Sequence, residues 1–423
     1  MINKLKLKSE FARNVLTLMT GTTIAQAIPI AISPILTRIY TPEDFGLFAI
    51  YFSIISIVSV FVTGKYELAI MLPTNDDEAF NIFILSIFIS ISISLIFFIF
   101  IFIFHSYLMS SFLPTQLHFW IYLAPISVLL TGIYKSLNHW SNRKKRYTSM
   151  SNNVMIQSFS NSTLNTTFGF INFAYMGLII TSIITNFLSV IYLFLINKKD
   201  IKFNVNLSLI KEQLLKYNQF PFHTMPQNLL YEASLQLPIF FIKFIFSTAI
   251  LGAFSFAYRI LGTPLSIIGN SLGQVYYQKA SIMYHSDKDK LYLYTKKMLL
   301  LMFIASLTFG SSIVWFLPSI FLFIFGENWS IAGEISQYLM IYFIFSFPIS
   351  PFTTIYLLAN QNLFFLKWEV MRFILILIFF IIYMSTNLKD IRSFFLIYSF
   401  LQLLLYIYIV IPIIDKKSVI WKD

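Results

Sequence analysis

The chain has 423 residues, of which 57% are hydrophobic and only 11% are charged, and its formal net charge is +12. This composition, which includes 48 Phe, is typical of a protein embedded in a lipid bilayer and excludes an ordinary soluble domain. The absence of cysteine excludes disulfides, thiolate metal sites and cysteine nucleophiles. The positive charge does not require a nucleic acid as partner, because basic loops that face anionic lipid headgroups account for it.

Long apolar runs predict the elements, since about 20 apolar residues span the roughly 30 Å hydrocarbon core as a helix. Six runs lie in the first half, at 14–38, 45–72, 81–104, 118–136, 153–172 and 175–197. Six more follow, at 219–246, 250–275, 297–325, 331–359, 363–387 and 391–414. The predicted fold is therefore an all-α polytopic membrane protein with about twelve transmembrane helices. The fifth run is rich in Asn, Ser and Thr between Asn152 and Thr167, which leaves open that it is not a full span.

The basic residues indicate the orientation in the membrane. The positive-inside rule assigns loops rich in Lys and Arg to the cytoplasm. Loop 135–152 carries five, whereas loops 105–117 and 326–335 carry none. The outer side is left with Arg38, Lys389 and Arg392. We therefore expect both termini to be cytoplasmic. The basic segment from Met1 to Arg13 resembles the start of a signal peptide, but the apolar run behind it is too long and predicts an uncleaved first helix.

The loops are too short to hold a soluble domain. The longest inner segment is 198–218, in which Leu207, Ile210, Leu214 and Tyr217 follow helical spacing. This pattern predicts a short interfacial helix, with an ordinary linker as the alternative.

Sequence motifs of catalytic sites are missing. The chain has no GxxxxGK[ST] phosphate loop, no HExxH pair and no GxSxG elbow. The histidines do not follow metal-ligand spacing and are expected at interfaces or in loops; they are His105, His118, His139, His223 and His285. We predict no catalytic residues, no cofactor and no metal site, and a protein that is not an enzyme.

Three predicted helices carry polar stripes, as helices that line a water-filled cavity do. Spacings of three and four residues place the polar side chains of the eighth helix on one face: Ser255, Arg259, Thr263, Ser266, Asn270 and Gln274. A similar stripe marks the seventh helix, with Asn228, Glu232, Gln236 and Lys243. The first helix has Thr22, Gln26, Ser33 and Thr37, with Arg38 beside its outer end.

Charged residues inside the runs are the strongest functional signal, because burying a charge at the bilayer centre costs at least about 2.5–3.5 kcal/mol. Arg259 is the deepest charge in this interpretation, and it either contacts an anion in a cavity or pairs with Glu232. Lys65 and Glu67 lie near the inner end of the second helix, where they line a cavity mouth or pair at the headgroups. For Lys243, near an outer helix end, snorkelling to the interface competes with function.

A weak internal duplication relates the two halves. Residues 26–30 (QAIPI) are echoed by 236–239 (QLPI), and residues 45–49 (FGLFA) by 251–255 (LGAFS). Paired broken helices in two six-helix halves are typical of alternating-access transporters. We therefore predict an N-terminal bundle at 1–197, a cytoplasmic linker at 198–218 and a C-terminal bundle at 219–423.

Several of these stretches resemble bacterial O-antigen and capsule flippases of the Wzx type. Residues 36–46 (LTRIYTPEDFG) resemble the turn after the first helix of that family, and residues 64–70 (GKYELAI) resemble the end of its second helix. Residues 257–271 (AYRILGTPLSIIGNS) resemble its eighth helix, while 219–221 (QFP) and 226–230 (PQNLL) fit the seventh. The chain is thus similar to members of the superfamily of multidrug, oligosaccharidyl-lipid and polysaccharide exporters.

The resemblance implies a fold and a substrate. The fold would be two bundles that form a V around a central cavity, in the bacterial cytoplasmic (inner) membrane. The substrate would be undecaprenyl-pyrophosphate-linked oligosaccharide, moved from the cytoplasmic to the periplasmic leaflet by a monomer, with a polysaccharide polymerase as a candidate partner. The positions that match the family's cationic and polar sites, together with the first-helix stripe, give the candidate substrate-binding set: Arg259, Arg38, Lys65, Asn228, Asn270 and Gln26.

The mechanism expected from this set is alternating access without covalent chemistry. Arg259 would bind the pyrophosphate, since a guanidinium forms bidentate hydrogen bonds to phosphate oxygens. Coupling to H⁺ or Na⁺ would use Glu67 or Glu232, the carboxylates that this interpretation places inside the spans. The alternatives are a multidrug or organic-cation antiporter of the same fold, which would need an acidic cavity, and a polysaccharide polymerase or ligase, which would need a large outer loop.

Overall fold

The computed structural model describes residues 2–200, 206–386 and 390–421, so the predicted outer Lys389 lies outside the described residues. Every regular element within these ranges is helical. Contacts divide the chain into an N-terminal unit, Met1–Tyr40 with Leu47–Gln236, and a C-terminal unit, Thr41–Gly46 with Leu237–Asp423. The division falls inside helix α9 (Met225–Ile245). The domain limits at 197 and 219, which follow the loops, stay a prediction.

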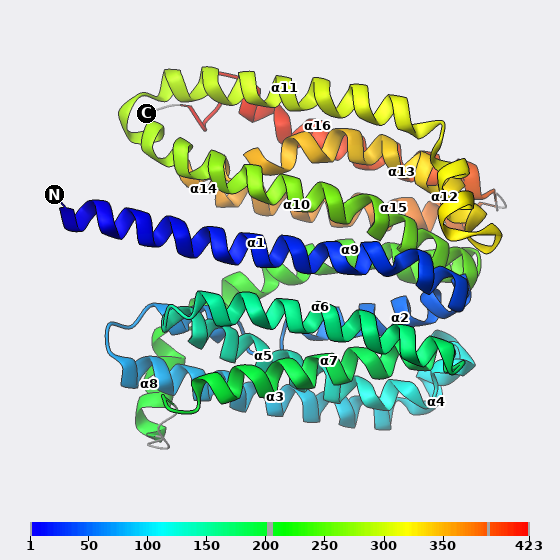
Figure 1. Ribbon diagram of the computed structural model, residues 1–423, viewed down its shortest axis with the longest axis horizontal. Coiled ribbons are helices and arrows are strands. Elements are labelled where there is room, and N and C mark those ends of the chain that lie inside the picture. Colours follow the sequence, from blue (N-terminus) through cyan, green and yellow to red (C-terminus); the bar gives the residue numbers. More distant parts are fainter. Residues whose placement is uncertain (1, 201–205, 387–389, 422–423) are drawn as a thin grey trace. The chain divides into compact units, whose positions relative to one another are not determined.

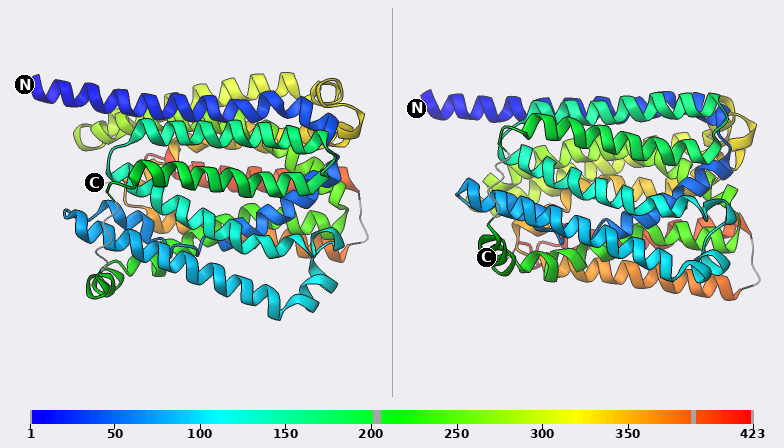
Figure 2. Two further views of the ribbon diagram at one scale, coloured as in Figure 1. Left: turned by 60° about the horizontal axis from the view of Figure 1, so that its bottom comes forward. Right: turned by 90° about the horizontal axis from the view of Figure 1, so that it is seen from below.

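The N-terminal unit is a bundle of long helices (Figure 1). In this bundle α1 packs along α6, α6 along α7, and both α3 and α7 along α5. Figure 2 shows α6 and α7 side by side. The helices up to the start of α9 are α1 (Ile2–Ile39), α2 (Pro42–Val58), α3 (Asp76–Ile103), α4 (His105–Tyr107), α5 (Ala124–Arg143), α6 (Tyr147–Phe170), α7 (Ala174–Asn197) and α8 (Leu207–Lys216). Short helical turns lie between them at η1 (Tyr66–Met71), η2 (Leu108–Phe112), η3 (Thr115–Leu117), η4 (Trp120–Leu123) and η5 (Phe220–Thr224).

The polar fifth run forms a regular helix, α6, of 24 residues. At 1.5 Å per residue it is about 36 Å long, which is enough to span a bilayer core. Its polar side chains bond to neighbouring helices: Ser158 Oγ donates to the Ala25 carbonyl of α1, and Gln157 Nε2 donates to Ser189 Oγ of α7 at 2.6 Å. The polar residues of this run therefore join helices inside the bundle.

The sequence predicted one continuous helix for the second run, and this prediction is wrong. Helix α2 ends at Val58, and residues 59–65 form successive turns before η1 begins at Tyr66. The left-handed backbone at Gly64 (φ 57°) and Lys65 (φ 63°) is incompatible with an α-helix, so one helix cannot continue through these two residues. The apolar content of this segment is high enough for a span, and only the backbone geometry shows the interruption.

The predicted interfacial segment contains helix α8, so the ordinary-linker alternative is wrong. Asn206 caps its start by accepting hydrogen bonds from the backbone N–H groups of Ser208 and Leu209. Ile210 and Tyr217 are buried in the core of the N-terminal unit, whereas Leu207 is exposed. In Figure 1, α8 runs across the ends of the long helices of this unit.

The C-terminal unit is built around α13, which contacts α10, α11, α12 and α16. After α9 its helices are α10 (Thr248–Ser286), α11 (Lys288–Val314), α12 (Leu317–Phe325), α13 (Ser330–Ile349), α14 (Ile355–Leu358), α15 (Asn362–Ser385) and α16 (Ile391–Ile414), with turns η6 (Glu327–Trp329) and η7 (Ser350–Phe352). The predicted ninth run at 297–325 is therefore two helices, since α11 ends at Val314 and α12 begins at Leu317. The tenth run likewise breaks after Ile349.

The duplicated glycines meet at a helix crossing in the C-terminal unit. A Cβ on Gly252 would lie 1.7 Å from the Pro42 carbonyl oxygen, and one on Gly46 would lie 2.0 Å from the Thr248 carbonyl oxygen. Both obstacles are backbone atoms, so the starts of α2 and α10 approach this closely only without side chains. The two glycines that the sequence pairs as an internal repeat are thus packing partners.

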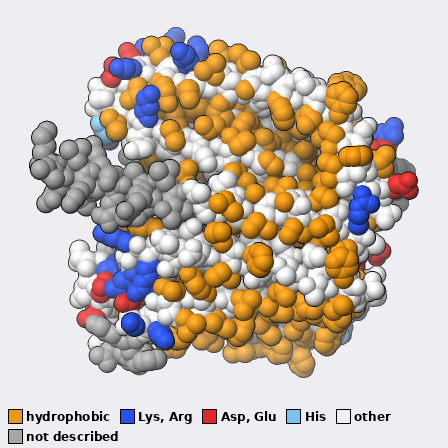
Figure 3. Space-filling model, in the orientation of Figure 1, with side chains coloured by type: hydrophobic (Ala, Val, Ile, Leu, Met, Phe, Trp, Pro, Cys, Tyr) orange, Lys and Arg blue, Asp and Glu red, His pale blue; other side chains and the backbone are white. Residues whose placement is uncertain are grey.

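Hydrophobic side chains cover the middle of the helices on the face drawn in Figure 3, and charged side chains lie toward helix ends. Eight helical stretches of the described residues are long and apolar enough to cross a membrane. One is the part of α1 from Met19 to Ile39, and the others contain α3, α5, α7, α10, α11, α13 and α16. The protein is therefore a multi-pass membrane protein, and the count of twelve spans, with α2, α6, α9 and α15 as the others, stays a prediction.

Candidate functional site

Charged side chains of the N-terminal unit gather beside the break after α2. Lys65 and Glu67 follow the break, and Lys135 and His139 lie on α5. Lys135 interacts electrostatically with Lys65, Glu67 and Glu232 of α9. His139 interacts with Glu67 and with both lysines. We call these five residues the N-terminal polar cluster.

The helix break itself positions Lys135. Its Nζ donates a hydrogen bond to the carbonyl of Ser59, the residue after the end of α2, at 2.8 Å. Carbonyls at a helix end lack intrahelical donors, so this oxygen is free to accept. The sequence placed Lys135 in loop 135–152 and His139 outside any span, and both assignments are wrong because α5 continues to Arg143. The two side chains are four residues apart and share one face of α5.

Glu67 is the most buried member of the cluster, with 3% of its surface exposed, and its carboxylate accepts a hydrogen bond from Thr63 Oγ1. Lys65 is half-buried and holds a left-handed backbone, which is strained for a residue with a Cβ. Strained backbone of this kind gathers at ligand sites, where surrounding structure maintains it. The turn therefore fixes a cation and an anion two residues apart.

A chain of hydrogen bonds joins Glu232 to α2. Gln236 Nε2 donates to Glu232 Oε1 at 2.9 Å, and Ser53 Oγ donates to Gln236 Oε1 at 2.6 Å. Asn228 instead bonds within its own helix, donating to the Thr224 carbonyl at 2.8 Å. Two residues of the predicted stripe on α9 therefore behave differently. Glu232 belongs to the N-terminal polar cluster, whereas Asn228 forms a hydrogen bond within its own helix.

The remaining predicted residues lie elsewhere. Arg259 and Asn270 are exposed on α10 in the C-terminal unit, together with Ser266 and Gln274, so most of that stripe shares one exposed face as predicted. Arg38 is exposed in the last turn of α1, and Gln26 is half-buried on the same helix. No hydrogen bond or ion pair between described residues joins either of them to the polar cluster.

The stripe predicted on the first helix does not form a single cavity-facing surface. Ser33 and Thr37 are only 1% and 3% exposed. Their hydroxyls donate to the carbonyls of Ile30 and Pro34 on the same helix. These hydroxyls form hydrogen bonds within α1 and pack inside the bundle, as Ser and Thr commonly do in apolar helices.

Two deeply buried charges among the described residues were missed by the sequence analysis. Glu369 and Arg372 on α15 are 1% and 4% exposed, so Arg259 is not the deepest charge, and Glu67 and Glu232 are not the only carboxylates inside the predicted spans. The sequence analysis did not single out either residue, although both lie inside the predicted run 363–387. The available signal was an acidic and a basic residue three apart beside Trp368 in an otherwise apolar helix.

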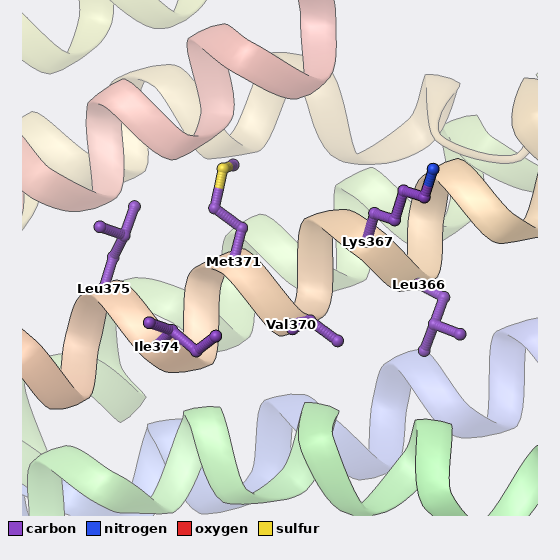
Figure 4. Close-up of a pocket in the computed structure, with 6 residues that line it drawn as sticks. All are labelled: Leu366, Lys367, Val370, Met371, Ile374 and Leu375. Carbon is purple, nitrogen blue, oxygen red and sulfur yellow. The ribbon is translucent and has the colours of Figure 1, made fainter.

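A groove of about 420 Å³ follows the surface of α15. Figure 4 shows Lys367 and Met371 pointing to one side of the helix and Leu366 and Val370 to another. Ile374 and Leu375 complete its lining. The groove is apolar apart from Lys367. Among the described residues, no group of three or more His, Asp or Glu is placed to hold a metal ion.

Sequence comparison assigns the family. The profile of the polysaccharide biosynthesis protein family matches residues 35–333, which is well over half of the chain. The chain belongs to the polysaccharide biosynthesis protein family. The match includes the N-terminal polar cluster and Arg259, and ends before α15. No curated protein gives a significant sequence match.

Solved structures with a similar fold are transporters. A MOP superfamily transporter from Pyrococcus furiosus Vc1 aligns with a TM-score of 0.67 at 13% identity, covering 97% of this chain and 96% of that one. A multidrug resistance MATE family transporter in an inward-facing conformation aligns with a TM-score of 0.65 at 16% identity, over 90% and 92% of the two chains. The outward-facing conformation of a MATE family transporter aligns with a TM-score of 0.63 at 14% identity, over 97% and 96%. The fold is that of the MOP superfamily.

Proposed function

We propose that this protein is a flippase that moves undecaprenyl-pyrophosphate-linked oligosaccharide from the cytoplasmic to the outer leaflet of the bacterial cytoplasmic membrane. The observation that carries the proposal is the N-terminal polar cluster, in which Lys65 and Lys135 converge on a broken helix of a transporter fold. Membership in a polysaccharide biosynthesis family supports a glycan as the cargo. A lipid-linked diphosphate is the anionic form in which such a glycan would meet a membrane protein.

The cluster has the chemistry that a diphosphate headgroup requires. Lysine ammonium groups bind phosphate as compact point charges with three donors each. Lys135 already donates to the Ser59 carbonyl, and two donors of its ammonium group stay available for phosphate oxygens. Arg259, exposed on α10, offers the planar bidentate donors that phosphate oxygens favour. The polar stripe on α10 would contact sugar hydroxyls while the polyprenyl tail stays in the bilayer.

Alternating access would carry the headgroup across. Inward-facing and outward-facing MATE family structures are both similar to this chain, which supports a fold able to adopt both states. The break after α2 provides a place where the chain changes direction within the N-terminal unit. Coupling to H⁺ or Na⁺ is part of the proposal, with Glu67 or Glu232 as the carrier in the N-terminal unit.

Multidrug or organic-cation antiport is the second candidate, because the structural neighbours include MATE multidrug transporters. An organic cation favours a site in which carboxylates outnumber cations. In the N-terminal polar cluster the two lysines offset the two carboxylates, so carboxylates do not outnumber cations. This charge balance disfavours an organic cation as cargo.

The experiment that tests the proposal is the leaflet distribution of undecaprenyl-linked oligosaccharide in cells that lack this protein and have no second flippase. We expect accumulation on the cytoplasmic face, restored to outward delivery by wild type and not by a variant with Lys65→Ala and Lys135→Ala. Rescue by Arg259→Ala would remove Arg259 from the phosphate site and keep the flippase. Normal outward delivery without the protein would contradict the proposal and favour drug export.

A further inference from the structure

A buried ion pair lies inside the C-terminal unit, apart from every residue used above. Glu369 and Arg372 are three residues apart on α15 and are 1% and 4% exposed. Arg372 Nη1 and Glu369 Oε2 are 3.8 Å apart, close enough for charge attraction and too far for a hydrogen bond. The pair is thus electrostatic only.

Polar atoms around this pair lack partners. Neither carboxylate oxygen of Glu369 has a hydrogen bond to a described residue, and neither has Arg372 Nε. A buried pair repays its desolvation only when further hydrogen bonds satisfy the remaining lone pairs and protons. This one does not, so its charged state is costly.

The two partners are supported unequally. Arg372 lies over the Trp368 ring, with its guanidinium carbon 5.6 Å from the ring centroid. It also interacts electrostatically with the hydroxyls of Tyr258 on α10, Tyr342 on α13 and Tyr406 on α16. A cation–π contact stabilises a guanidinium in an apolar setting without needing a carboxylate. Arg372 can therefore stay charged whether or not Glu369 does.

Glu369 has no such second support. The one charged group that interacts with it is Arg372, among the described residues of the helices packed around it. The other titratable groups around Arg372 are tyrosines: Tyr258, Tyr342, Tyr398 and Tyr406. Protonation of Glu369 would remove the uncompensated charge and leave Arg372 in its aromatic surroundings.

We propose that Glu369 is a proton-binding site of the C-terminal unit, ionised against Arg372 in one conformation and neutral in another. The step is simple protonation of a carboxylate, with the proton taken from one side of the membrane and released to the other. Helices α10, α13, α15 and α16 all supply side chains to the site, so a change of charge on Glu369 acts on the packing of four helices at once. This proposal rests on the ion coupling in the proposed function and assigns it to a residue outside the N-terminal polar cluster.

Infrared spectroscopy of the purified full-length protein in lipid nanodiscs tests the site directly, because a protonated carboxyl has its own carbonyl band. We expect a band that titrates with pH in wild type, is lost in Glu369→Gln, is retained in Glu67→Gln and is shifted in midpoint by Arg372→Lys. Glu369→Asp, which keeps the carboxyl, should retain a titrating band and guards against loss through misfolding. A titration identical in wild type and in Glu369→Gln would overturn the proposal.

Transport tests the coupling separately. In cells that depend on this protein, we expect collapse of the proton gradient to slow outward delivery in wild type, and Glu369→Gln to be slow with or without the gradient. Normal delivery by Glu369→Gln with unchanged sensitivity to the gradient would overturn the coupling role. If the band behaves as expected but wild type delivers no lipid-linked oligosaccharide, the proposed function fails and the proton site stands.

Discussion

The two polar regions of this protein handle buried charge in opposite ways. In the N-terminal polar cluster three members form hydrogen bonds: Lys135 donates to the Ser59 carbonyl, Glu67 accepts from Thr63 and Glu232 accepts from Gln236. In what we call the C-terminal polar centre (Glu369 and Arg372), both carboxylate oxygens and Arg372 Nε lack hydrogen bonds to described residues. Hydrogen-bonded charges suit a site that stays charged and binds a ligand. Buried charges without hydrogen bonds suit a site that changes its charge.

Removing one member of the unsatisfied pair should give the largest effect. Arg372→Leu leaves Glu369 buried without a counter-charge, and we expect a loss of about 3–5 kcal/mol in the free energy of unfolding. The double variant Glu369→Leu with Arg372→Leu removes both charges and should recover most of that loss. Thermal unfolding in detergent, with both variants compared to wild type, measures the difference. Equal destabilisation by the single and the double variant would contradict the description of the pair.

Removing a hydrogen bond from the N-terminal polar cluster should destabilise the protein less than Arg372→Leu does. Thr63→Val removes the donor to the buried Glu67 carboxylate and should destabilise the protein by about 1–3 kcal/mol. The matched control is Thr181→Val on α7, because Thr181 is fully buried and its hydroxyl has no partner among the described residues. The control should be neutral or stabilising. If both variants behave alike in thermal unfolding, the Thr63–Glu67 bond is not stabilising.

Charge in the N-terminal polar cluster should affect transport more than stability. Lys135→Met keeps the aliphatic stem and removes the ammonium group, and we expect outward delivery of the lipid-linked oligosaccharide to fall about tenfold, equivalent to about 1.4 kcal/mol. Lys135→Arg, which keeps the charge, should retain most delivery. A variant that loses delivery only in proportion to its expression level would show a structural role instead.

The smallest expected effect on stability comes from Lys65, where one substitution distinguishes backbone strain from the role of the charge. Lys65→Gly relieves the left-handed backbone at φ 63° and should stabilise the fold by up to about 1 kcal/mol, since glycine adopts that conformation freely. The same variant removes a cation of the N-terminal polar cluster and should reduce delivery. Higher stability with lower delivery is the expected combination, and a gain in both would remove Lys65 from the binding site.

Much of the fold could be predicted from hydropathy and charge. Each of the twelve predicted runs contains a described helix, and the short helix at 207–216 was predicted from the spacing of Ile210 and Tyr217. The errors occur where backbone geometry overrides composition. The left-handed Gly64 and Lys65 interrupt the second run, and polar residues on one face of α5 carry that helix beyond its apolar core to Arg143.

Three of the five residues of the N-terminal polar cluster were singled out from the sequence. Lys65, Glu67 and Glu232 were chosen because charge is rare inside apolar runs, and the structure brings them together. Lys135 and His139 were missed because a helix end predicted from hydropathy is placed at the first charged residue. Glu369 and Arg372 were missed because a residue near the start of a predicted span reads as a loop residue, whereas helix packing decides how deeply it is buried.

The central claim is that the transported molecule is an anionic lipid, and binding to the purified protein tests it most directly. Undecaprenyl pyrophosphate and the organic cation tetraphenylphosphonium would be titrated separately against wild type and against a variant with Lys65→Ala and Lys135→Ala. We expect wild type to bind the pyrophosphate lipid, the variant to bind it at least tenfold more weakly, and neither to bind the cation with comparable affinity. Tight binding of the cation by wild type, with no effect of the two lysines on the lipid, would contradict the account.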